Sequence, residues 1–190
     1  NKPIILSLHN ELTPFDKFNT KISLSRPYYG IDELYANPPV YDTYITGSDQ
    51  VWNPTQSYCI EPYFLTFAKN GRKISYASSV GIKTLTKKEK NDFSKWLRQY
   101  EAVSVREPSA QELLSSISGV EIGQVSDPTF LLDIEYWKKL AVTPSFSEYI
   151  MVFTLSFDQS MIEYGLKIAE ESGKKLISVN MVQPDDDRYI

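Results

Sequence analysis

From residue 41 onward, short apolar segments alternate with segments whose apolar residues recur at the helical period, and this alternation limits the possible folds more than any other feature. The strand-like segments are 41–46, 73–78, 102–106 and 119–125. Parallel strands need long crossover connections, usually helices, whereas antiparallel strands can be joined by tight turns. The alternation therefore predicts an α/β fold with a largely parallel, Rossmann-like sheet that is covered on both faces.

Two helices are predicted between these strands. In the first, over residues 86–100, Thr86 and Glu89 have the spacing of a capping box. Its apolar face consists of Phe93, Trp96, Leu97 and Tyr100. The second helix opens at Pro108, because proline is favoured in the first helical turn.

The last third of the chain predicts one further βαβ unit. The segment 142–147 has the composition of a linker, and 149–155 is a continuous apolar run, as expected for a strand buried on both faces. Ser160 and Glu163 have capping-box spacing, and Gly173 is a plausible stop for that helix. Before the linker, Asp133 is a candidate cap for a short helix.

These segments predict two domains. The first is a Rossmann-like domain over residues 1–142, in which 1–40 shows no clean period although 3–8 could form a strand. Residues 143–190 would be a linker and the first βαβ unit of a second, incomplete Rossmann-like domain, since so short a unit rarely buries enough surface to fold alone. The alternative is that this unit completes the first sheet. Because the chain begins with Asn rather than Met, we expect it to be part of a longer protein.

Composition and charge exclude several classes of function. The formal net charge is −4 with no long basic run, which argues against binding nucleic acid. A single Cys (Cys59) and a single His (His9) leave no set of metal ligands, so we expect no metal site. The chain has no visible signal peptide and no apolar run of the ~20 residues that span a bilayer. We expect the protein to be cytoplasmic, either free or located at the inner face of the membrane.

Small and polar residues follow four of the predicted strands. They lie in the stretches GSDQVWN (47–53), SYASSVG (75–81), SVREPS (104–109) and VSDPTFLL (125–132). Ligands of parallel α/β sheets gather at the carboxyl ends of the strands. Hydroxyls and free backbone N–H groups at these ends would suit an anion, above all a phosphate.

Arg106 is the sharpest single candidate, because a guanidinium at a strand end can hold a carboxylate or a phosphate with two hydrogen bonds. The structural alternative is an ion pair with Glu107 or with a carboxylate across the sheet. Asp49 with Ser48 could equally be turn or cap residues. Purely structural roles are alternatives for several other residues. Trp52 could be a core residue, Asp127 a turn residue, and Cys59 an unreactive thiol. Ser78 and Ser79 could simply keep the end of the strand small.

The ordered series of these motifs resembles the polysaccharide pyruvyl transferase family. The series runs GSDQVWN, YFLTF (63–67), KISYASSVG (73–81), SVRE (104–107) and DPTFLL (127–132), followed by Trp137. The similarity covers roughly residues 40 to 180. GSDQVWN is its strongest element.

The resemblance implies a fold and an activity. Members of the family transfer the pyruvyl group of phosphoenolpyruvate to hydroxyls of a surface polysaccharide or its lipid-linked precursor, so the expected partners are phosphoenolpyruvate and a sugar acceptor, with no cofactor. The family resembles glycosyltransferases of the two-Rossmann-domain, GT-B type, which bind their substrates between the domains.

The resemblance also implies roles for particular residues. Arg106 would anchor one anionic group of the donor, and Asp49 would be the base that assists the attacking hydroxyl. The remaining substrate-binding candidates are Gly47, Ser48, Gln50, Asn53, Ser78 and Ser79.

Two departures from the family pattern bear on activity. Members open with a first strand and a glycine- or asparagine-rich loop, and they carry a Ser-Phe-His-Gly-like element in the second domain whose His is a candidate acid. Neither occurs here, and His9 does not replace that His. We therefore expect this chain alone to be a fragment without turnover. The rival functions are a glycosyltransferase that uses a nucleotide sugar and a carbohydrate-binding relative without catalysis.

Overall fold

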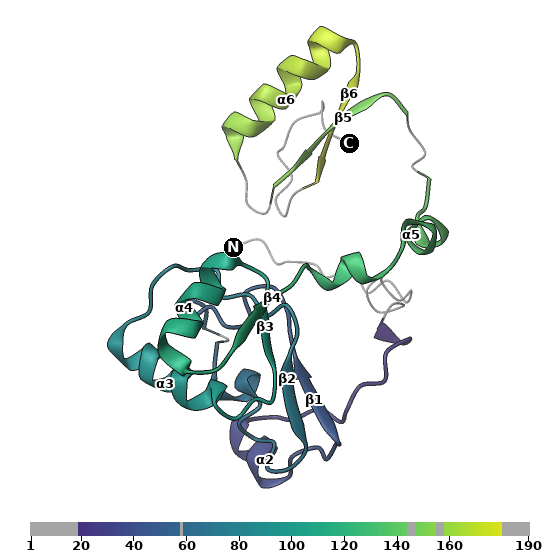
Figure 1. Cartoon of the computed structure of the whole chain (residues 1–190). Coiled ribbons are helices and arrows are strands. Elements are labelled where there is room, and N and C mark those ends of the chain that lie inside the picture. The colour runs from purple at the N-terminus through teal and green to yellow at the C-terminus, as the bar shows by residue number, and fades with distance from the viewer. Residues whose placement is uncertain (1–18, 58, 144–146, 155–157, 180–190) are drawn as a thin grey trace, which may run out of the picture. The chain divides into compact units, whose positions relative to one another are not determined.

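A computed structural model of the chain describes residues 19–57, 59–143, 147–154 and 158–179. The chain divides into two compact units, Asn1–Leu132 and Asp133–Ile190 (Figure 1). The proposed domain limits at 142 and 143 remain a prediction. The possible strand at 3–8 and His9 lie outside the described residues.

Among its described residues, the first unit contains four parallel strands. They are β1 (Thr43–Thr46), β2 (Arg72–Ser75), β3 (Val103–Val105) and β4 (Ile122–Gln124). β1 pairs with β2 and β3 pairs with β4, in both cases in parallel. The two pairs are joined by isolated parallel bridges, one of which includes a hydrogen bond of 3.0 Å from the Ser75 N–H to the Ala102 carbonyl. The prediction of parallel pairing is thus confirmed, in small sheets.

The two helices of this unit begin where their local signals indicate. α3 (Lys87–Leu97) is capped by Thr86, whose hydroxyl accepts from the Glu89 N–H while the Glu89 carboxylate accepts from the Thr86 N–H. This is the predicted capping box. α4 (Pro108–Ser118) opens at its proline and ends at a glycine in the left-handed conformation.

The helices that connect the described strands, α3 and α4, lie on one face of them. α3 and α4 pack against each other on the same side (Figure 1), over a face that includes Tyr44, Val103 and Val105. On the other face the side chain of Ile45 is 64% exposed. The prediction of a sheet covered on both faces is therefore wrong here. The strands follow one another in sequence order, and right-handed crossovers then place every connecting helix on the same side.

An aromatic cluster forms much of the core of the first unit. Trp52 is fully buried and stacks on Phe64 with ring centroids 5.1 Å apart, and Tyr100 meets Trp52 edge-on. The core interpretation of Trp52 is confirmed. Phe64 belongs to the short 3-10 helix η1 (Glu61–Phe64). This helix and the long loops on either side of it connect β1 to β2.

Two short helices lie near the ends of the first unit. α2 (Ile31–Ala36) precedes β1. The 3-10 helix η2 (Pro128–Leu131) follows β4 and is capped by Asp127, whose carboxylate accepts from the Thr129 N–H at 2.9 Å. Asp127 is thus a turn residue, as predicted.

The second unit contains the predicted βαβ unit. Its elements are α5 (Ile134–Leu140), β5 (Tyr149–Phe153), α6 (Gln159–Ser172) and β6 (Lys175–Val179). β5 and β6 are parallel, Asp133 caps α5, and Gly173 ends α6 in the left-handed conformation.

Two predictions for this unit are wrong. The cap of α6 is Asp158, whose carboxylate accepts from the Met161 N–H at 3.1 Å, and Ser160 instead donates to Asp158. A carboxylate two residues earlier thus takes the bond that the serine was expected to take. β5 is not buried on both faces, because Met151 and Phe153 are 60% and 63% exposed.

No helix within the described ranges is long and apolar enough to cross a bilayer.

Candidate functional site

The carboxyl ends of the four parallel strands are held together by backbone hydrogen bonds that extend past the strands. The Tyr76 N–H donates to the Thr46 carbonyl at 2.9 Å, and the Val125 N–H donates to the Val105 carbonyl at 3.0 Å. Between them, the Arg106 N–H donates to the Ser78 carbonyl at 3.3 Å. The loops that follow the strands are therefore neighbours, as expected for parallel strands.

Arg106 lies at the centre of this region, directly after β3. Its guanidinium donates to Asp49 from the loop after β1, and to Asp127 from the loop after β4 at 3.2 Å. Glu107 is the third carboxylate, with an oxygen 3.5 Å from Nη2 of Arg106. The predicted alternative of ion pairs is thus present, and a role in donor binding remains a prediction.

These contacts shift the pKa values of Arg106 and Asp127 in the directions that favour their charged forms. The hydrogen bond to Asp49, followed by that to Asp127, raises the pKa of the Arg106 guanidinium above its usual value. The Thr129 N–H and hydroxyl, and then Arg106, lower the pKa of the Asp127 carboxyl. Both groups are therefore charged at neutral pH.

The loop after β1 is shaped by a close backbone approach. A Cβ on Gly47 would overlap the Tyr76 carbonyl oxygen, so only glycine fits there without movement. Gln50 has a φ of 47°, in the left-handed region. The Asn53 amide donates to the Gln50 side chain at 2.8 Å, and its oxygen accepts from the Thr55 N–H at 3.0 Å. The side chains of Gln50 and Asn53 are therefore engaged in hydrogen bonds within the loop.

The two serines of the loop after β2 are fully buried. The Ser78 hydroxyl donates to the Thr46 carbonyl at 3.3 Å, and the Ser79 hydroxyl donates to Glu107. Both hydroxyls join one strand end to another. Their direct contact with a ligand remains a prediction.

A pocket of about 370 Å³ lies at these strand ends. Its lining residues are Ile45, Gly47, Ser48, Asp49, Tyr76, Ala77, Arg106, Asp127 and Pro128. We call it the arginine pocket. It brings together four of the predicted site residues, whereas Gln50, Asn53, Ser78 and Ser79 lie outside its lining.

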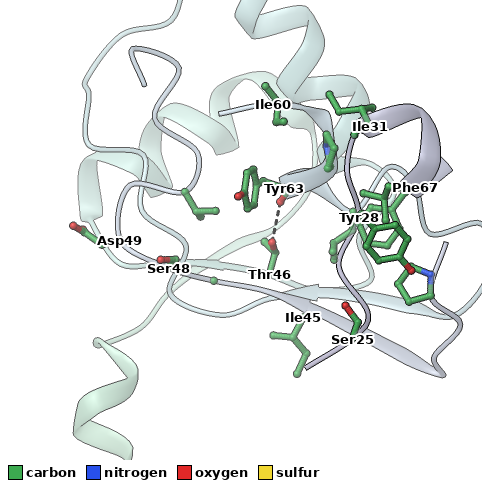
Figure 2. A pocket seen from close by; sticks show the side chains of 17 residues that line it. Ser25, Tyr28, Ile31, Ile45, Thr46, Ser48, Asp49, Ile60, Tyr63 and Phe67 are labelled. Carbon is green, nitrogen blue, oxygen red and sulfur yellow. Dashed lines mark hydrogen bonds between the residues drawn. The ribbon is translucent and has the colours of Figure 1, made fainter. Parts of the chain in front are cut away.

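A larger pocket, of about 800 Å³, adjoins the arginine pocket through four shared residues: Ile45, Gly47, Ser48 and Asp49. We call it the aromatic pocket. Figure 2 shows Ser48 and Asp49 toward one end of it, and Tyr28 and Phe67 toward the other.

Sequence reasoning missed two features of this region. Glu107 and Asp127 were assigned structural parts only, although both face Arg106; their position directly after strands would have placed them at the site. Tyr28 and its neighbours were missed because residues 1–40 carry no periodic signal.

The residues that the structure describes give little support for metal binding or for a reactive thiol. No cluster of three or more His, Cys, Asp or Glu could hold a metal ion. Cys59 is half-buried, and burial raises the pKa of its thiol to about 11, which disfavours the reactive thiolate.

Comparison with known proteins gave one match. A family model described as polysaccharide pyruvyl transferase matches residues 2–187. No curated protein and no solved structure matches the chain.

Proposed function

The chain belongs to the polysaccharide pyruvyl transferase family, and from this premise we propose that it binds phosphoenolpyruvate in the arginine pocket for transfer of the pyruvyl group to a sugar. We further propose that the first unit is a Rossmann-like domain of a GT-B-like enzyme. The observation that carries the proposal is Arg106, a charged guanidinium at the carboxyl ends of parallel strands, where such sheets bind their ligands.

The reaction defines what the pocket must do. A proton adds to the methylene carbon of phosphoenolpyruvate and leaves C2 electron-poor. A sugar hydroxyl oxygen bonds to C2 and loses its proton, and the C2–O bond to phosphate breaks, with phosphate taking the electron pair. A second hydroxyl then bonds to C2 and loses its proton, which completes the ketal. One of the two hydroxyl protons balances the proton added to the methylene carbon, and the other leaves with phosphate.

Electrostatics decides how an anionic donor can enter. One guanidinium faces the three carboxylates Asp49, Glu107 and Asp127, so this group carries a net charge of about −2 and repels a further anion. One carboxylate must leave before the donor pairs with Arg106. Asp49 is the one placed to do so, because its side chain is 69% exposed, against 27% for Glu107 and 32% for Asp127.

Displacement of Asp49 from Arg106 by the donor would give Asp49 its role as the base. While Asp49 accepts from Arg106, its carboxylate is held at the guanidinium. When the donor replaces Asp49 at Arg106, the carboxylate becomes free to act as the base. Asp127, held by Thr129, keeps the guanidinium oriented toward the donor.

Titration with phosphoenolpyruvate tests the proposal. Arg106→Ala should weaken phosphoenolpyruvate binding by about 10- to 100-fold, the effect of losing hydrogen bonds to a charged group. Arg106→Lys should recover little, because an ammonium cannot reproduce the planar pair of bonds. Arg72→Ala is the matched control, since Arg72 also pairs with a carboxylate but begins β2 at the other end of the strand.

The rival functions are separated by the same titration. Phosphoenolpyruvate affinity that is equal in the Arg106→Ala variant would contradict the proposal. A nucleotide sugar that raises Tm where phosphoenolpyruvate does not would favour a glycosyltransferase. Sugar binding without any response to phosphoenolpyruvate would favour a non-catalytic relative.

A further inference from the structure

The aromatic pocket is a second concave site beside the arginine pocket, and its lining differs in charge. None of the described residues that line it is Lys, Arg or His. Asp49, at its border with the arginine pocket, is its one Asp or Glu. A lining without a cation fits a neutral ligand better than a phosphate or a carboxylate.

The walls of the aromatic pocket are apolar. Tyr28, Ile31, Ile60, Tyr63 and Phe67 line it, and Figure 2 shows them around the space above β1. Tyr63 is 44% exposed, although its backbone carbonyl accepts hydrogen bonds from the Thr46 hydroxyl at 2.8 Å and the Trp52 indole N–H at 3.1 Å. The ring is therefore presented on a rigid backbone and remains free to take a ligand.

A second aromatic ring is also held in place. The Arg26 guanidinium lies 4.3 Å from the centroid of the Tyr28 ring. Tyr28 is also one of the residues that line the aromatic pocket. Two tyrosines thus supply aromatic surface with hydroxyls at its margin, a lining suited to ligands that are partly apolar and partly hydroxylated.

The polar side chains of the lining lie in two places, with Ser25 apart from Ser48 and Asp49 (Figure 2). Ser48 and Asp49 belong to both pockets, whereas the Thr46 hydroxyl is already bonded to the Tyr63 carbonyl. A pyranose ring has an apolar C–H face and an edge of hydroxyls. A pyranose with this face against Tyr63 would turn its hydroxyl edge toward Ser48 and Asp49, which also line the arginine pocket.

We propose that the aromatic pocket is the subsite for the acceptor sugar, a neutral pyranose whose reacting hydroxyl points to Asp49. This inference rests on the proposed function, since it takes the arginine pocket as the donor site. The loop 47–49 then separates the donor from the acceptor, and Asp49 passes from Arg106 to the hydroxyl when the donor binds.

Binding of simple glycosides tests the subsite. The probes are methyl β-D-glucopyranoside, methyl β-D-galactopyranoside and methyl α-D-mannopyranoside, observed by saturation-transfer NMR and titration. We expect at least one to bind. Tyr63→Ala should weaken it about 3- to 10-fold, the effect of losing one aromatic contact. Tyr63→Phe should retain the affinity within about 2-fold because the ring remains.

The matched control is Tyr164→Ala, which removes a tyrosine that is 63% exposed on α6 and outside the pocket. It should leave glycoside binding unchanged. Circular dichroism and Tm of each variant establish that the fold is retained.

Three results would overturn the subsite. They are equal glycoside affinity in Tyr63→Ala, loss of glycoside binding in Arg106→Ala, and no binding of any of the three probes up to about 50 mM. Binding of octyl β-D-glucopyranoside alone would assign the pocket to an alkyl chain and also contradict the proposal.

The outcomes distinguish this inference from the proposed function. Phosphoenolpyruvate binding that depends on Arg106, without glycoside binding that depends on Tyr63, would remove the subsite and leave the donor site. Glycoside binding that depends on Tyr63, without phosphoenolpyruvate binding, would leave a sugar site and remove the proposed donor.

Discussion

The buried hydroxyl of Ser79 donates a hydrogen bond to the carboxylate of Glu107, and this bond joins the loop after β2 to the first residue before α4. The other Glu107 oxygen accepts from the Val80 N–H at 3.4 Å. Because Glu107 directly follows Arg106, the bond also fixes the backbone that carries the guanidinium. The two strand ends are therefore held in one arrangement.

Glu107→Ala should lower the free energy of unfolding by about 1–3 kcal/mol, because it leaves the buried Ser79 hydroxyl without an acceptor. Urea unfolding measures the loss. Glu112→Ala, an exposed position on the same helix, is the control and should have a small effect. In the double variant with Ser79→Ala the losses should be less than additive, since the orphaned hydroxyl is gone; strictly additive losses would argue against the contact.

Gly47→Ala should destabilise the first unit by about 1–3 kcal/mol, because its Cβ would overlap the Tyr76 carbonyl and push the loops apart. It should also weaken phosphoenolpyruvate binding, since Gly47 lines the arginine pocket. Gly123→Ala is the control: its Cβ would lie 3.7 Å from that of Ser104, an ordinary contact, with an expected effect within about 0.5 kcal/mol. Equal Tm values for the two variants would contradict the close approach.

Cys59 should react slowly with iodoacetamide. Burial raises the pKa of its thiol from 9.0 to about 11, so near pH 8 the thiolate fraction falls about 100-fold relative to the unfolded chain. Cys59 is the single cysteine, so mass spectrometry of the alkylated chain reports this site alone. The urea-unfolded chain at the same pH is the control, and similar rates in both states would refute the pKa shift.

Asp127→Asn should reduce stability at neutral pH and have less effect in acid. The Thr129 N–H and hydroxyl, and then Arg106, lower the pKa of the Asp127 carboxyl in the folded chain. The stability from a lowered carboxyl pKa is present above the unfolded value and is lost as pH falls through the folded value. Asparagine remains a good cap, so mainly the charge is removed.

Urea unfolding of both proteins between about pH 7 and pH 3 checks this dependence. The difference between wild type and variant should shrink below about pH 4, the range in which the unfolded carboxyl gains its proton. A difference that stays constant over the whole range would mean that the ionised form of Asp127 has no special partners.

Much of the fold could be predicted because its signals are local. The Thr86–Glu89 capping box, Pro108 at the start of α4 and Gly173 at the end of α6 each depend on residues within about one helical turn. Where two local signals competed, the prediction was wrong: Asp158 caps α6 in place of Ser160.

The apolar pattern predicted parallel strands but not which faces are covered. Whether a strand's second face is covered depends on the order of strands and on the hand of their connections, which no single segment encodes. Ile45 and Phe153 are apolar strand residues that nevertheless lie largely exposed in the described chain.

The sequence by itself determined that Arg106, Asp49, Ser48 and the two serines of the loop after β2 lie at strand ends, because strand boundaries follow from local composition. Only the tertiary structure decided their partners. Arg106 meets Asp49 across 57 positions and Asp127 across 21, whereas Ser78 and Ser79 turn inward to join the strand ends. Such pairs depend on the order and register of parallel strands, and these are set by packing between segments far apart in the chain.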